Sequence, residues 1–435
     1  MLKQTAIING DRVIQRATLK LMPLLGLLYL IAYIDRQNIG YAKLQMVASL
    51  GVSEAVYGLG ASLFFIGYLL FEVPSNMMLA KIGARRTFSR IMLSWGVVTV
   101  ALAFTNSTWM FYILRFLLGV CEAGFYPGVL YYLTLWFPAR SRSRLVGYFM
   151  IGSAVANAIA APIGGALLDL NGLLGMHGWQ WVFIVTGIPA IVMGVVVLKI
   201  LPDTPREAKF LSASEKMWLL TTLHTEEKNI APGKPANPSE VLRDGRVYLM
   251  AFYFLFFPLS AYGLSYWLPT IVKGFGVSNT VNGLLNIIPW VIVAFALWWV
   301  PRRSVIKNEQ TWHIVLPALF GALCLLLSVV VPGNTFKFIF LCLAAAGIFA
   351  GQPVLWTLPG RFLVGANAAV GLAMINSIGN LGGFISQNVV PMIKDRTGSD
   401  VAPMLFLSAC LAFGGLMTFV MQAVIRTSER RMANK

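Results

Sequence analysis

Five charged residues lie inside stretches that are otherwise apolar and long enough to cross a membrane: Asp35, Arg36, Glu72, Arg115 and Glu122. An ionisable side chain in hydrocarbon costs roughly 2.5–3.5 kcal/mol on insertion scales unless it is paired or faces a watery cavity. Carboxyl groups can carry protons, and a guanidinium can bind a carboxylate through two parallel hydrogen bonds. These residue types therefore predict that the chain moves a polar solute across a membrane.

The rest of the composition indicates an integral membrane protein. The chain is 57% hydrophobic and 12% charged, with a mean hydropathy of +0.73, whereas a soluble domain is ~25% charged. The polar, basic segment from Met1 to Lys20 leads directly into a long apolar stretch. We therefore expect no cleavable secretory signal.

Cysteine and histidine spacing predicts neither a metal site nor a disulfide. The four cysteines all lie in apolar stretches, and the three histidines are scattered. No nucleophile–base set, metal cluster or nucleotide-binding loop is evident in the sequence. We expect a protein that is not an enzyme and that uses no cofactor, only a proton gradient as driving force.

Hydropathy predicts an all-α membrane protein of twelve spans in two sets of six. The polar segment 202–246 separates the sets, so we expect an N-terminal segment 1–18, bundles at 19–201 and 247–425, and a tail 426–435. The predicted spans are 19–41, 54–82, 88–107, 109–136, 145–169, 179–201, 247–272, 280–300, 312–332, 336–358, 365–391 and 401–425.

The basic residues predict the orientation of these spans. About 27 of the 34 lysines and arginines fall in alternate loops, the central segment and the two ends of the chain, which is the positive-inside pattern. Both termini and the central segment are therefore expected to be cytoplasmic. The same distribution argues against a nucleic-acid partner, despite the formal charge of +17.

Four sequence segments carry a family resemblance. They read YIDRQNIG at 33–40, FEVPSN at 71–76, RFLLGVCEAGFYPG at 115–128 and INSIGNLGGF at 375–384. They resemble the anion:cation symporter family of the major facilitator superfamily, and in particular bacterial transporters for rhamnonate, tartrate, 4-hydroxyphenylacetate and nicotinate. The resemblance implies two six-helix bundles that rock about a substrate site near the membrane midplane. The general facilitator signature after the second span is altered here, with Asn76 and Ala80 in place of its glycine and aspartate.

The charged residues of the first half suggest distinct roles. Asp35 and Arg115 are expected at a similar depth in the first and fourth spans, where they can form an ion pair. That pairing leaves Arg36 free to bind a substrate carboxylate, as the resemblance also implies. Glu122 lies two helical turns beyond Arg115 and ~10 Å deeper, so it is the expected proton carrier, with Asp35 as a second candidate. Glu72 is expected to act in gating.

The second half has no membrane-embedded charge and offers neutral hydrogen-bonding and aromatic side chains instead. We expect Tyr262, Trp356 and Asn376 to line the substrate site there, facing Tyr33 and Tyr68 of the first half. The resemblance implies this role for Trp356 and Asn376. In this division the first half holds the anion and the proton, and the second half contacts the body of the ligand.

The leading hypothesis is proton-coupled uptake, by symport, of a small sugar acid or hydroxy acid such as rhamnonate or tartrate. Uptake of an aromatic carboxylate and anion antiport remain open. Cation or drug export is opposed by Arg36, and a nutrient sensor on this fold is a further alternative. We expect a functional monomer in the bacterial inner membrane whose partners are the anion, protons and lipid.

Overall fold

The computed structural model describes residues 9–230, 241, 243–363 and 366–433, and every regular element in that part of the chain is a helix. The predicted all-α class is therefore confirmed. Parts of the predicted terminal segments (1–8 and 434–435), of the linker (231–240 and 242) and of the eleventh span (365) lie outside the described residues.

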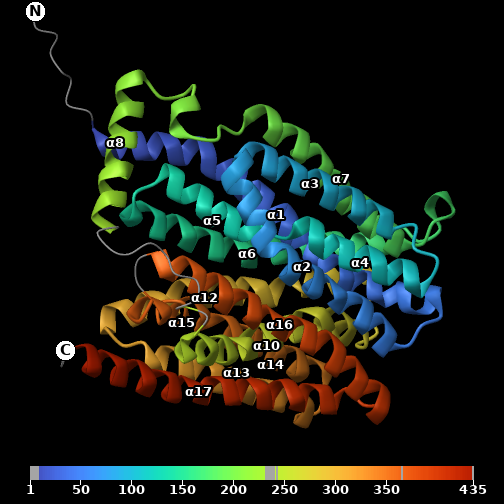
Figure 1. The fold of residues 1–435 in the computed structure, drawn as a ribbon. Helices are drawn as coiled ribbons and strands as arrows, with labels where there is room; N and C mark the ends of the chain where they lie inside the picture. Colours follow the sequence, from blue (N-terminus) through green and yellow to red (C-terminus); the bar gives the residue numbers. More distant parts are fainter. Residues whose placement is uncertain (1–8, 231–240, 242, 364–365, 434–435) are drawn as a thin grey trace, which may run out of the picture.

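The helices form two groups, which follow one another in the sequence. Figure 1 shows the first group as the upper layer and the second as the lower layer, with α8 (Ala213–Ile230) at the end where both termini lie. The first group contains α1 (Gly10–Leu50), α2 (Glu54–Ile82), α3 (Ala84–Leu102), α4 (Thr108–Glu122), α5 (Phe125–Trp136), α6 (Ala139–Leu168) and α7 (Gly178–Ile200). The second contains α10 (Gly245–Lys273), α11 (Asn279–Leu285), α12 (Ile287–Lys307), α13 (Thr311–Val330), α14 (Asn334–Ala350), α15 (Gln352–Leu355), α16 (Ala366–Thr397) and α17 (Val401–Ala433).

Each predicted span falls on one helix or on one interrupted pair. The interrupted pairs are α4–α5, α11–α12 and α14–α15. Among the described residues, nine helices or adjoining pairs are long and apolar enough to cross a membrane. The count of twelve spans and the domain boundaries stay predictions.

The break between α4 and α5 follows from local sequence. Gly124 adopts a left-handed conformation with φ of 86°, which glycine adopts without steric cost. A Cβ at this position would lie 2.6 Å from the hydroxyl oxygen of Ser75, so the close approach of α2 also requires glycine. The break makes Glu122 the last residue of α4 and sets it deep in the interior.

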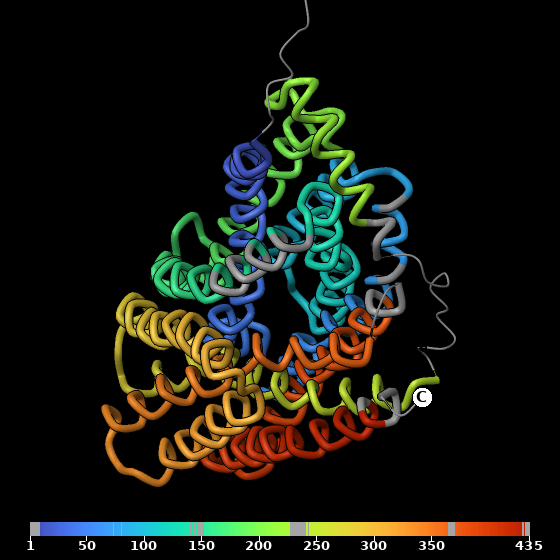
Figure 2. The backbone as a smooth tube through the Cα atoms, turned by 90° about the vertical axis from the view of Figure 1, so that its left-hand side faces the viewer, coloured from blue at the N-terminus to red at the C-terminus, as the bar shows by residue number. Residues whose placement is uncertain are grey.

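The two groups pack closely at the end away from the termini. A Cβ on Gly58 of α2 would collide with the carbonyl of Gln387 on α16, and one on Gly165 of α6 with that of Asn279 on α11. Asp169, just after α6, accepts hydrogen bonds from the Asn279 side chain at 2.8 Å and from the Thr280 backbone at 3.1 Å. Figure 2, drawn from the end where both termini lie, shows the first group above and the second below. This far end is therefore joined by small-residue packing and by a charged hydrogen-bond acceptor.

Candidate functional site

A cavity of about 170 Å³ lies between the two groups of helices. Its walls come from α1, α2, α5 and α6 on one side and from α10, α12, α14, α15 and α16 on the other. All six residues predicted to bind substrate line it: Tyr33, Arg36, Tyr68, Tyr262, Trp356 and Asn376. The structure thus brings the predicted set together at one place, and their role in binding stays a prediction.

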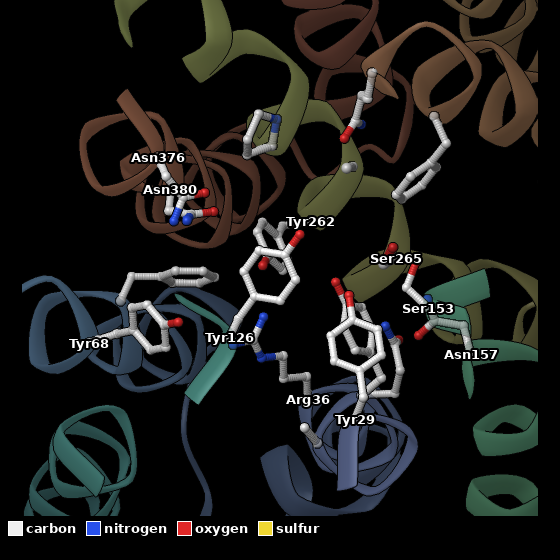
Figure 3. A pocket seen from close by; sticks show the side chains of 18 of the residues that line it. Tyr29, Arg36, Tyr68, Tyr126, Ser153, Asn157, Tyr262, Ser265, Asn376 and Asn380 are labelled. Carbon is white, nitrogen blue, oxygen red and sulfur yellow. The ribbon is translucent and has the colours of Figure 1, made fainter. Parts of the chain in front are cut away.

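The cavity wall is aromatic with one cation. Eleven of the 23 described lining residues are Phe, Tyr or Trp, and among those 23 Arg36 alone carries a charge. The guanidinium carbon of Arg36 lies 5.5 Å from the ring centre of Tyr68 and 5.6 Å from that of Tyr33. In Figure 3, Arg36 points from α1 towards Tyr262 of α10, and Asn376 and Asn380 lie side by side on α16.

Arg36 is engaged by a carboxylate, contrary to the prediction that it is free. Its Nε donates to Oε1 of Glu122 at 2.6 Å, and its Nη2 lies at the same distance from that oxygen. The Glu122 side chain is fully buried, whereas that of Arg36 keeps 17% of its surface exposed. The proton-carrying candidate and the anion-binding candidate are therefore each other's partners.

Asp35 does not line the central cavity, and its predicted ion pair with Arg115 is wrong for this structure. Its carboxylate accepts hydrogen bonds from Trp95 at 2.7 Å, Asn38 at 2.9 Å and Thr99 at 3.2 Å. Successive residues of an α-helix point about 100° apart, so Asp35 and Arg36 are directed to different neighbours. Asp35 meets α3, and Asn38 extends the network to Thr186 of α7 at 2.5 Å.

Arg115 is buried with a backbone partner in place of the predicted carboxylate. Its Nη2 donates to the carbonyl of Ala61 on α2 at 2.8 Å, and its guanidinium carbon lies 5.2 Å from the ring centre of Phe64. Arg115 and Phe64 also line a second, water-sized cavity of about 20 Å³, together with Asp35, Arg36 and Glu122. Four of the five predicted charges therefore surround one small space.

Glu72 joins the two groups of helices. Its carboxylate accepts hydrogen bonds from the Ser377 hydroxyl and, at 3.3 Å, from the amide of Asn376. Asn376 therefore contacts both the cavity and Glu72. This bridge from α2 to α16 fits the gating role predicted for Glu72, which stays a prediction.

Several residues of the cavity were missed from the sequence. Tyr29 and Gln37 lie one helical turn on either side of Tyr33, and Tyr126 adjoins the α4–α5 break. The sequence held a signal for Tyr29 and Gln37: each is four residues from Tyr33 in α1, and residues four apart share a helix face. Gln387 of α16 lines the small cavity, and its place seven residues beyond Asn380 was a similar signal.

Known proteins resemble the chain over nearly its whole length. Residues 25–387 match the family model described as Major Facilitator Superfamily. The chain is 43% identical to the "Quinolone resistance transporter" of Acinetobacter baumannii, with 97% of this chain and 98% of the relative covered. It is 40% identical to a "Putative tartrate transporter" of Agrobacterium vitis, with 100% and 98% covered.

A solved structure matches the fold. The xylose transporter XylE from E. coli, in a partially occluded inward-open conformation, gives a TM-score of 0.74 at 14% identity, with 93% of this chain and 98% of that chain covered. At this identity the likeness concerns the fold alone. The relatives and the fold neighbour are transporters, not enzymes.

Proposed function

The chain belongs to the Major Facilitator Superfamily of multi-pass membrane transporters, and on that premise we propose that it takes up a small organic anion together with protons. The observation that carries the proposal is the contact between Arg36 and Glu122 at the wall of the central cavity. Arg36 can bind an anion and Glu122 can bind a proton. The contact between them makes anion binding and proton binding depend on each other.

The proposed coupling is competition for one guanidinium. While Glu122 is charged, it occupies two donors of Arg36 through its Oε1 oxygen. Protonation removes the charge of Glu122, and Arg36 can then turn its donors to a substrate carboxylate in the cavity. Proton binding and anion binding therefore favour each other, and this coupling is reciprocal at equilibrium. Loss of the proton restores the Arg36–Glu122 pair and releases the anion.

The packing of the two groups supports an assignment of which side of the membrane this conformation is closed to. The close contacts at Gly58, Gly165 and Asp169 lie at the end away from the termini. With both termini in the cytoplasm, as the basic loops predict, that end is extracellular and the conformation is closed to the outside. The bacterial inner membrane is the proposed location, with rocking of the two groups exposing the cavity to each side in turn.

The size and lining of the cavity favour a small acid. An engineered cavity of ~150 Å³ in another protein binds benzene, so about 170 Å³ suits a ligand of modest size. Asn376, Asn380 and Gln352 supply amide groups for hydroxyl groups of the ligand. A sugar acid or hydroxy acid, with its carboxylate on Arg36, is the proposed substrate, and the relative named for tartrate supports this class.

An aromatic carboxylate is the second candidate. The eleven aromatic side chains of the wall favour stacking on a flat ring, and Phe254 and Trp356 already pack with ring centres 4.7 Å apart. A relative is named for quinolone resistance, which keeps export of a larger compound as an outcome to be tested. Anion antiport differs from symport in needing no proton.

Counterflow in proteoliposomes separates these functions. Unlabelled acid inside the vesicle should draw in labelled tartrate or another hydroxy acid if it is a substrate, and an aromatic acid should do so if the second candidate is right. An imposed pH gradient should then drive accumulation for symport but not for antiport. If neither class of acid exchanges, the proposed function is wrong.

A further inference from the structure

The second cavity offers a polar site that the coupling scheme above does not use. It measures about 20 Å³ and is lined by residues of α1, α2, α4, α10 and α16. A cavity needs roughly 10–15 Å³ to hold one water molecule. The space is therefore large enough for one water and too small for a substrate.

Three polar atoms of the lining residues have no hydrogen-bond partner among the described residues: Nε of Arg115, Oε2 of Glu122 and Oε1 of Gln387. All three residues are at least 95% buried, with exposures of 5%, 0% and 5%. A buried polar atom left without a partner is destabilising, and more so when its group is charged. Buried waters typically bond to such otherwise unsatisfied atoms.

The donors and acceptors complement a single water molecule. Arg115 Nε–H donates, whereas Glu122 Oε2 and Gln387 Oε1 accept. A water within hydrogen-bond distance of all three atoms would accept from Arg115 and donate to the two oxygens, and would satisfy all three at once. If Glu122 is protonated, the same water can accept from its hydroxyl, so the site tolerates both states.

We propose that this cavity binds one water molecule that bridges Arg115, Glu122 and Gln387, and that Gln387 is thereby a positioning residue of the proton site. The inference rests on the proposed proton role of Glu122. Gln387 belongs to α16 in the second group, whereas Arg115 and Glu122 belong to α4 in the first. The site is complete only when α16 is packed against the first group, as it is here.

The charged and polar groups around this cavity determine the effect of the proposed water on Glu122. The charged and polar residues that line this space are Asp35 and Arg36 from α1, Arg115 and Glu122 from α4, Tyr262 from α10 and Gln387 from α16. Arg36 and Tyr262 also line the central cavity. The proposed water links Arg115 to the otherwise unpaired Oε2 of Glu122 and thereby stabilises the charged form of Glu122.

Replacing Gln387 by methionine tests the role of the second group. Gln387→Met keeps the length of the side chain but removes the acceptor, so the water is lost or displaced. The charged form of Glu122 is then less stable, and the pH midpoint of proton-driven uptake should rise by about one unit or more, the shift expected for one lost hydrogen bond to a charged group. Counterflow, which moves no net proton, should change by less than about threefold, a factor worth under 1 kcal/mol.

Asn388→Met is the matched control. Asn388 adjoins Gln387, and its amide donates to Ser62 of α2 at 2.6 Å, but it does not line the small cavity. It disturbs the same helix–helix contact and should leave the pH midpoint unchanged. A wild-type midpoint in Gln387→Met, or an equal shift in both variants, would overturn the proposal.

A structure determination tests the water site without a transport assay. A high-resolution structure of the wild-type protein in this conformation should show a solvent peak within hydrogen-bond distance of Arg115 Nε, Glu122 Oε2 and Gln387 Oε1. Its absence would overturn the proposal even if Gln387→Met does not fold. If the peak is present but wild-type vesicles show no response to a pH gradient, the proposed function fails and the water site stands.

Discussion

Replacing Glu122 by glutamine should tighten the binding of the substrate acid at neutral and alkaline pH. In the structure, two donors of Arg36 lie 2.6 Å from Oε1 of a fully buried carboxylate. A hydrogen bond to a charged group contributes about 1.5–3 kcal/mol, and a substrate carboxylate must displace this contact. Glu122→Gln removes the charge but keeps a carbonyl oxygen, so we expect the lower end of this range, a gain of about tenfold in affinity.

The pH dependence is the sharper part of this prediction. Protonated Glu122 resembles glutamine, so wild-type affinity should rise on acidification and approach that of Glu122→Gln, by at most about tenfold per pH unit for one proton. The variant should bind with little pH dependence. Calorimetric titration of the purified protein with tartrate, or with the acid that counterflow identifies, measures both affinities.

The control and the refuting result are specific. Glu309→Gln makes the same substitution at a carboxylate that pairs with His313 outside the cavity, 2.9 Å away, and should leave affinity and its pH dependence unchanged. Weaker binding in Glu122→Gln, or a pH dependence equal to that of the wild type, would show that Glu122 does not compete with the substrate for Arg36.

Substitutions at three other residues test the site and the far end. Arg36→Lys keeps the charge but loses the planar fork, so equilibrium binding of the acid should weaken at least about tenfold, as for loss of one charged hydrogen bond, and Arg36→Ala should abolish it. Trp95→Phe removes one of the donors to Asp35 and should lower the unfolding free energy by about 1–3 kcal/mol in denaturant titration. Asp169→Ala removes the acceptor for Thr280 and should expose thiols engineered at the far end to faster labelling.

Each of these predictions has a clear contrary result. Wild-type affinity in Arg36→Lys and Arg36→Ala would place the carboxylate site elsewhere, and unchanged stability of Trp95→Phe would mean that Asp35 is satisfied without it. Hydrogen bonds from Thr280 and Asn279 hold the pKa of Asp169 below its usual value. Its contribution is therefore present above about pH 4 and is lost as the pH falls through the lowered pKa. Thiol labelling of Asp169→Ala at neutral pH that is no faster than that of the wild type would contradict this role.

The sequence predicted the fold class, and it predicted a set of residues that the structure brings together at one cavity. Long apolar runs define the helices, and charges inside them are costly enough to be informative. The resemblance at 33–40 and 115–128 led to the superfamily that the comparisons confirm, and the predicted binding residues line one cavity. Hydropathy and motif spacing therefore predict which side chains meet at this cavity, and their role in binding stays a prediction.

The pairing of charges could not be predicted from the same information. Depth along a helix gave Asp35 and Arg115 as neighbours, but the rotation of each helix decides which side chains meet. Asp35 is satisfied by Trp95, Asn38 and Thr99, and these neutral donors give no signal in a charge pattern. Gln387 was missed for a related reason, because its contact depends on how α16 packs against the first group of helices.

The central claim, that protons drive uptake through the Arg36–Glu122 pair, is tested most directly by accumulation of labelled acid in proteoliposomes under an imposed pH gradient alone. Wild-type protein should concentrate the acid inside vesicles whose lumen is alkaline, and Glu122→Gln should equilibrate it without concentrating it while retaining counterflow. Accumulation by Glu122→Gln equal to that of the wild type would contradict the account and leave Asp35 as the coupling carboxylate.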